Sequence, residues 1–267
     1  MHADVFDRIA KHAPFHDAGH GFDVFGLHPP DLARVVSASA PIYERYFRVE
    51  SHGIEQVPAS GPAILVANHS GVLPVDAAML CLDVLRRTEP PRIPRAIADY
   101  FVPRIPLVAT AFARFGVVSG TRANVRYLLE HDELLAIWPE GVTGTGKPFR
   151  ARYRLQEWRV GFAEHAIRHR APVIPVAILG AEESWPLAKP LRGVHPFGAP
   201  YWPIPFVPFP LPTHYRITYG TPMRLDHDDL AATAGDPEVV AAAADRVRVA
   251  LQQLVDDART ARRGLFR

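Results

Sequence analysis

Short apolar segments alternate along this chain with longer segments that carry the spacing of an amphipathic helix. The clearest apolar segment, Ala63–Ala67, is followed after a polar turn by 75–87, where apolar residues recur three or four positions apart. Strands that alternate with helices of about 10–15 residues are typical of a parallel sheet, because each helix returns the chain to the starting edge. The alternation predicts an α/β fold with a mostly parallel central sheet flanked by helices.

The same pattern divides the chain into three parts. Residues 1–48 are expected to form an irregular N-terminal arm and a helix, 49–225 the main domain, and 226–267 a C-terminal helix. A proline- and aromatic-rich insertion, 185–212, interrupts the main domain. The expected strands are 46–58 (a strand pair or an edge strand), 63–67, 95–99, 116–118, 134–138, 172–180 and 214–220. The expected helices are 31–47 with a break at Pro41, 75–87, 122–131, 157–169 and 237–263.

Composition excludes several classes of protein. The 267 residues carry a formal net charge of only +2, which argues against a dedicated nucleic-acid binder. The single cysteine, Cys81, excludes internal disulfide bonds and is typical of a reducing compartment. No signal peptide is expected at the N-terminus. No apolar run reaches the length of about 18 residues that would predict a membrane-spanning helix.

A histidine and a carboxylate closely follow the apolar segment 63–67. Asn68-His69-Ser70-Gly71 ends the expected strand, and Asp76 lies at the start of the expected helix. Ligands of open α/β sheets bind beyond the carboxyl ends of the strands, where a histidine of ordinary pKa near about 6.5 can act as a general base. An acidic residue nearby can fix the imidazole tautomer. Alternatively, His69 is a hydrogen-bonded turn residue and Asp76 a helix cap.

Two other strand ends carry polar residues. Trp138-Pro139-Glu140-Gly141 ends the expected strand 134–138 in a sharp turn, where a carboxylate and backbone N–H groups can face a ligand. Gly116–Arg122 leads from a strand into a helix, and a guanidinium at a helix start can hold an anion. Taken singly, these patterns are more typical of an ordinary turn and a surface arginine.

Two patterns that suggest other chemistry are incomplete. Gly141–Lys147 has the glycines and lysine of a nucleotide-binding P-loop, but Pro148 stands where the magnesium-binding Ser or Thr belongs. A nucleoside triphosphatase is therefore disfavoured. The histidines at 12, 16 and 20 have the spacing of helical metal ligands, but Pro14 interrupts the helix that would align them, so no metal site is predicted.

In this order, the motifs resemble the conserved blocks of the phospholipid/glycerol acyltransferase superfamily. Asn68-His69 with Asp76 resembles its histidine–aspartate block, Gly116–Arg122 its arginine block, Trp138–Gly141 its F-P-E-G block, and Val173–Val176 its V-P-V block. Each block alone is weak. Four in sequence on an α/β pattern favour functional roles for the histidine, the arginine and the glutamate.

The resemblance spans roughly residues 50–222 and has two departures. The family usually places four residues between the histidine and the aspartate, whereas six, 70–75, separate His69 from Asp76 here. Asp76 can therefore orient the histidine only through a longer turn, as in an N-H-S-G-type subgroup. Trp138 replaces the family's phenylalanine. This variant and the long insertion favour a non-standard member, with a neutral lipid among the candidate acceptors.

The resemblance implies an O-acyltransferase of this fold. It would move a fatty acyl group from an acyl thioester, acyl-CoA or acyl-carrier protein, to a hydroxyl of a glycerolipid such as a lysophospholipid, 1-acylglycerol-3-phosphate or diacylglycerol. His69 would be the base, oriented by Asp76, and Arg122 would hold an acceptor phosphate or headgroup, with no metal or other cofactor needed. The residues implied to bind substrate are Asn68, Ser70, Gly71, Arg122, Glu140 and Gly141. The alternative is a non-catalytic lipid-binding member of the same fold.

The insertion 185–212 suggests how such an enzyme would reach a membrane lipid. It is nearly uncharged and contains Trp185, Phe197, Tyr201, Trp202, Phe206 and Phe209. Aromatic residues favour the membrane–water interface. We expect peripheral contact with the cytoplasmic side of a membrane through this insertion, or an acyl groove lined by it. The alternative is an irregular loop packed on the domain.

Overall fold

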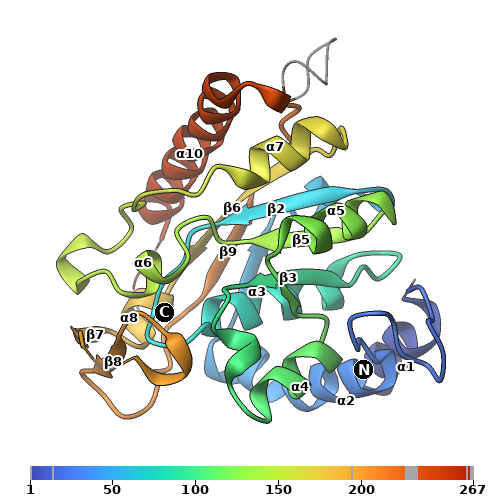
Figure 1. Ribbon diagram of the computed structural model, residues 1–267. Coiled ribbons are helices and arrows are strands. Elements are labelled where there is room, and N and C mark those ends of the chain that lie inside the picture. Colours follow the sequence, from blue (N-terminus) through green and yellow to red (C-terminus); the bar gives the residue numbers. More distant parts are fainter. Residues whose placement is uncertain (1, 14, 194, 226–233, 263, 265–267) are drawn as a thin grey trace.

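A seven-stranded sheet forms the middle layer of the computed structural model, which describes all residues except 1, 14, 194, 226–233, 263 and 265–267 (Figure 1). The strand order is β1-β9-β6-β2-β5-β3-β4, in which β9 runs antiparallel to β6 and the other neighbours are parallel. The prediction of a mostly parallel sheet is confirmed. Its strands are β1 (Glu50–His52), β2 (Ala63–Ala67), β3 (Pro94–Ala98), β4 (Val118–Ser119), β5 (Leu134–Ile137), β6 (Val173–Leu179) and β9 (Arg216–Tyr219).

Helices cover both faces of this sheet (Figure 1). The α-helices are α1 (His2–His12), α2 (Pro29–Ala38), α3 (Val75–Arg87), α4 (Val108–Arg114), α5 (Arg122–Glu130), α6 (Val142–Thr145), α7 (Gly161–Arg168), α8 (Ala181–Ser184) and α10 (Pro237–Thr260). Shorter helical turns are η1 (Ile42–Tyr46), η2 (Ile54–Gln56), η3 (Val102–Arg104), η4 (Phe149–Ala151) and η5 (Pro196–Gly198).

The central strand β2 shows how the layers are built. All of its residues are buried, as expected for a parallel strand that is covered on both faces. Ile64 and Val66 pack into the cluster formed by α5, α7 and α10, whereas Ala63, Leu65 and Ala67 pack into the cluster formed by α1, α2 and α3. The side chains therefore alternate between two apolar cores, one on each face of the sheet.

The prediction of an irregular N-terminal arm was wrong for the first turns of the chain. His2–His12 form helix α1, which buries Val5 and Ile9 next to α2. A short helix is marginal by itself and gains its stability from packing, which local spacing does not reveal. Further along this segment, Asp23 forms a buried ion pair of 2.6 Å with Arg95 of β3.

The C-terminal helix ends slightly earlier than expected. It spans Pro237–Thr260 as α10, and the Asp236 side chain caps its start by accepting hydrogen bonds from the N–H groups of Glu238 and Val239. Leu251 and Val255 pack against residues of β6. Of the expected segment 226–267, residues 226–233, 263 and 265–267 lie outside the described residues.

The insertion 185–212 folds as an antiparallel hairpin of β7 (Leu187–Leu191) and β8 (Trp202–Pro205). The Trp185 indole closes the insertion on itself by donating to the Val207 carbonyl at 2.9 Å. The Tyr201 hydroxyl lies 2.8 Å from that of Thr145 and fastens the insertion to the domain. Phe197, Trp202, Phe206 and Phe209 are instead exposed. Within the described part of the chain, no helix has the length and apolar character needed to cross a bilayer.

Candidate active site

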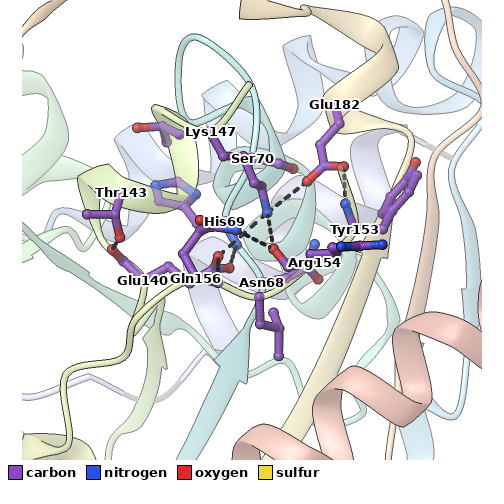
Figure 2. Close-up of polar contacts among 12 residues, drawn as sticks. Asn68, His69, Ser70, Glu140, Thr143, Lys147, Tyr153, Arg154, Gln156 and Glu182 are labelled. Carbon is purple, nitrogen blue, oxygen red and sulfur yellow. Dashed lines mark hydrogen bonds and ion pairs between the residues drawn. The ribbon is translucent and has the colours of Figure 1, made fainter. Parts of the chain in front are cut away.

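Three polar turns meet at one edge of the sheet. β2 is the parallel neighbour of both β5 and β6, so the carboxyl ends of all three strands face the same way. Asn68 and His69 follow β2, Glu140 follows β5, and Glu182 follows β6 within two or three residues. Figure 2 shows the side chains of these turns converging on one another.

Asn68 joins two of the strands. Its amide nitrogen donates to the Ile178 carbonyl at 2.9 Å, and its amide oxygen accepts from the Ile178 N–H at 2.7 Å. The side chain is buried, and both of its polar atoms are occupied. The structure therefore gives Asn68 a place in the sheet, where it holds β2 against β6, and its substrate-binding role stays a prediction.

His69 and Asp76 form a close pair despite the long spacing between them. The imidazole Nδ1 lies 2.7 Å from Asp76 Oδ2, which also accepts the Ser70 N–H at 2.9 Å. Gly71, with φ +88°, turns the chain back so that Asp76 enters the first turn of α3. Asp76 is fully buried, and the His69 side chain is 14% exposed. No described residue hydrogen-bonds to His69 Nε2, which is therefore the nitrogen available to a substrate.

Nearby charges govern the basicity of His69. Burial lowers the pKa of the imidazole, but Asp76 and then Glu140 raise it, while Lys147 lowers it, and the net result is a pKa above the ordinary value. The Trp138 ring lies 5.7 Å from the imidazole, centroid to centroid. The site thus holds a basic histidine that retains limited access to solvent.

Glu140 supports the histidine from its backbone side. One carboxylate oxygen accepts the His69 N–H at 3.0 Å, and the other accepts the Gln156 N–H at 2.8 Å. The residue is buried. Its carboxylate therefore positions the His69 turn instead of facing an open pocket.

Gly141 lies against an ion pair that the sequence motifs did not identify. Asp99, directly after β3, pairs with Arg159, and a Cβ placed on Gly141 would lie 3.1 Å from the Asp99 carboxylate and 3.2 Å from the Arg159 guanidinium. Gly141 also has a positive φ of +51°. One sequence feature could have identified Asp99. Like His69 and Glu140, it is a polar residue within three positions of the end of a parallel strand.

The P-loop-like segment does not form a phosphate cradle. The helix that directly follows Gly141, α6, has only four residues, Val142–Thr145. The Lys147 side chain is 4% exposed, and its ammonium lies 2.8 Å from the Glu182 carboxylate and 3.5 Å from that of Glu140. A lysine neutralised by two buried carboxylates is not free to bind a phosphate. Burial, opposed by Lys147, raises the pKa of the Glu182 carboxyl to about 7.

Comparison with known proteins identifies the family. A family model described as Acyltransferase matches residues 48–179. An uncharacterized protein of Mycobacterium tuberculosis is 35% identical over 258 residues, covering 92% of this chain and 72% of the relative. The chain is a member of the phospholipid/glycerolipid acyltransferase superfamily. Its His69–Asp76 pair corresponds to the family's histidine–aspartate block and lies at the carboxyl edge of the sheet.

Two further matches are a human relative and a solved bacterial structure. The human "DGAT1/2-independent enzyme synthesizing storage lipids" is 28% identical over 230 residues, covering 84% of this chain and 65% of the relative. The crystal structure of the 1-acyl-sn-glycerophosphate (LPA) acyltransferase PlsC from Thermotoga maritima matches with a TM-score of 0.54 and 18% identity, covering 85% of this chain and 81% of that chain. The second match shows a shared fold.

Arg122 lies apart from the histidine of the acyltransferase. It begins α5, its side chain is 82% exposed, and it forms an ion pair of 3.1 Å with Glu164 of α7. None of its described contacts reaches His69, Asp76 or Glu140. The structure therefore brings together the first and third blocks, whereas Arg122 of the arginine block lies at the surface.

Ser70 and Gly71 differ in their access to solvent. Ser70 is fully buried, and its hydroxyl has no hydrogen-bond partner among the described residues. Gly71 lines a small pocket, open to solvent, whose walls include Phe149, Trp185 and Leu187. Of Ser70 and Gly71, only Gly71 lines this pocket among the described residues.

Gly144 provides a test of how closely the acyltransferase loops are packed. A Cβ at this position would lie 2.8 Å from the His69 carbonyl oxygen and 2.9 Å from the Glu140 Cβ, so Gly144→Ala must displace one of these turns. We expect kcat/KM for acyl transfer to fall by about 10²-fold, since a displacement of about 1 Å has such an effect. Gly161→Ala is the control because nothing lies near its added Cβ. Equal activity of the two variants would contradict the described packing.

Proposed function

We propose that this acyltransferase moves a fatty acyl group from an acyl thioester, acyl-CoA or acyl-carrier protein, to a hydroxyl of a glycerolipid, with His69 as general base. The observation that carries the proposal is the 2.7 Å contact between His69 Nδ1 and the buried Asp76 carboxylate at the carboxyl edge of the sheet. This contact directs the N–H toward Asp76 and leaves Nε2 as a proton acceptor.

The chemistry follows from that tautomer. Nε2 takes the proton of the acceptor hydroxyl as the oxygen attacks the thioester carbonyl, and a C–O bond forms. Collapse of the tetrahedral intermediate breaks the C–S bond, and the imidazolium returns the proton to the leaving thiolate. Asp76 stabilises the imidazolium in between. Gly71 lines the pocket, and its N–H donates to no described residue, so we propose this N–H as a donor to the oxyanion.

Among glycerolipids, we propose a neutral acylglycerol such as diacylglycerol as the preferred acceptor. The human relative is named as an enzyme that synthesizes storage lipids. The exposure of Arg122, whose described ion pair is with Glu164, also favours this choice, because a phosphorylated acceptor would call for a guanidinium beside the reacting hydroxyl.

The substrate assignment is tested with purified protein and labelled oleoyl-CoA or oleoyl-acyl-carrier protein. The acceptor panel holds lysophosphatidate, lysophosphatidylcholine, monoacylglycerol and diacylglycerol. We expect label in a glycerolipid product, with diacylglycerol the best acceptor. Label predominantly in phosphatidate would overturn the neutral-lipid choice. No labelled lipid with either donor would favour the alternative of a non-catalytic lipid-binding protein.

We also propose that the β7–β8 hairpin makes peripheral contact with the cytoplasmic face of a membrane. Trp202 is 50% exposed, Phe206 66% and Phe209 76%, all within one short segment. Exposed aromatic side chains of this kind are favoured at the membrane–water interface. Tyr201 fastens the hairpin to the domain through Thr145, and Trp185 and Leu187 line the pocket at Gly71, so the exposed rings would be presented beside that pocket.

Replacing Trp202 and Phe206 together by serine is expected to reduce co-flotation with liposomes severalfold, because two large apolar groups no longer enter the interface. The control is the double replacement of Val24 and Val249 by serine, at positions that are 57% and 58% exposed on other elements. Liposome binding that is the same for both variants would show that the hairpin is not the membrane contact.

A further inference from the structure

Lys147 is unusual among the lysines of this chain. Lys11 and Lys189 are exposed, whereas Lys147 is buried. Figure 2 shows its side chain between Glu182 and Glu140. Its Nζ lies 2.8 Å from the Glu182 carboxylate and 3.5 Å from that of Glu140, and it donates to the Arg154 carbonyl at 3.5 Å. A buried ammonium is costly unless it is paired in this way.

The two carboxylates connect Lys147 to all three turns of the site. Glu140 follows β5 and accepts the N–H of His69, which follows β2. Glu182 follows β6, and its other oxygen accepts the Tyr153 N–H at 2.6 Å. One cation thus lies at the centre of contacts that join the turns after three neighbouring strands.

We propose that Lys147 is a positioning residue of the acyl-transfer site, which holds Glu140 against the His69 backbone and supplies positive charge beside the His69–Asp76 pair. It acts through Glu140 and through its electric field, and it does not touch the reacting atoms. The glycines and lysine that resemble a P-loop therefore serve the histidine rather than a nucleotide.

The charges around His69 determine the expected direction of the effect. Asp76 faces the imidazole from α3, Glu140 from the turn after β5, and Lys147 from the loop after α6, while Glu182 of α8 reaches it through Lys147. The two acids that face it raise the pKa of His69, and Lys147 lowers it. Loss of the lysine charge therefore raises the pKa of His69. Because the base must be neutral, activity then requires a higher pH.

The test compares Lys147→Met/Glu182→Gln with Glu182→Gln alone. Removing Lys147 by itself leaves two buried carboxylates without their cation and is expected to lower the melting temperature. In the double variant, the amide replaces one of these carboxylates, and Glu140 still accepts its two backbone N–H groups. We expect the acidic limb of kcat/KM against pH to lie about half a pH unit or more higher in the double variant than in Glu182→Gln.

A second readout does not rest on the proposed function. The imidazole titration of His69 is followed by NMR without substrate, assigned by its absence in His69→Gln, and should move upward by the same amount. Lys11→Met, which removes an exposed lysine paired with Asp7, is the control and should move neither readout. An unchanged His69 titration, or a double variant that fails to fold, would overturn the proposal. A protein without acyl-transfer activity but with the shifted titration would instead contradict only the proposed function.

Discussion

Replacing His69 by alanine is expected to lower kcat/KM for acyl transfer by about 10²–10⁴-fold, the usual contribution of a positioned general base. The loss follows from geometry, because Nε2 is the proton acceptor that the Asp76 contact leaves available. The side chain is partly exposed and packs beside Trp138, so the variant should fold with a similar melting temperature. The rate is measured with labelled acyl donor and the best acceptor.

His52→Ala is the matched control for this substitution. His52 ends strand β1, is 45% exposed and lies 3.7 Å from Glu50, away from the site. It should retain wild-type activity. If His69→Ala retained activity to the same degree, His69 could not be the base.

Asp76→Asn is expected to produce a loss of similar size, about 10²–10⁴-fold in kcat/KM. The asparagine amide can donate to Nδ1, which would move the imidazole proton to Nε2 and remove the proton acceptor. Because Asp76 raises the pKa of His69, its neutralisation also lowers that pKa. The residual activity should therefore persist to lower pH than in the wild type.

Asp31→Asn is a suitable comparison because it alters another histidine–aspartate pair. His28 Nδ1 lies 3.0 Å from Asp31 Oδ2, and Arg34 and Arg114 also pair with this carboxylate. We expect a change in stability and no change in the pH profile of acyl transfer. Asp76→Asn with the activity and pH profile of the wild type would show that Asp76 does not orient the histidine.

Much of the central sheet could be predicted from local sequence. The segments 63–67 and 75–87 coincide with β2 and α3, because a buried strand and an amphipathic helix each impose a spacing on the chain. The helix α1 and the hairpin β7–β8 escaped prediction since packing and cross-strand pairing stabilise them. Local periodicity does not report such contacts.

The site was predictable to a lesser extent. His69, Asp76 and Glu140 stand in short motifs at strand ends, and the structure brings them together. The contact between Lys147 and Glu182 was not predicted, because the two residues are 35 positions apart in sequence and only the fold brings them together. Asn68 is the opposite case: it belongs to a recognisable motif, but its side chain hydrogen-bonds to the backbone of β6.

The central claim is that the His69–Asp76 pair catalyses acyl transfer to a glycerolipid. Its most direct test incubates wild type and His69→Ala side by side with labelled oleoyl-CoA and diacylglycerol or a lysophospholipid, and measures labelled lipid after extraction. The account predicts labelled glycerolipid from the wild type and a rate reduced by about 10²-fold or more from the variant. Equal product from both proteins would contradict it.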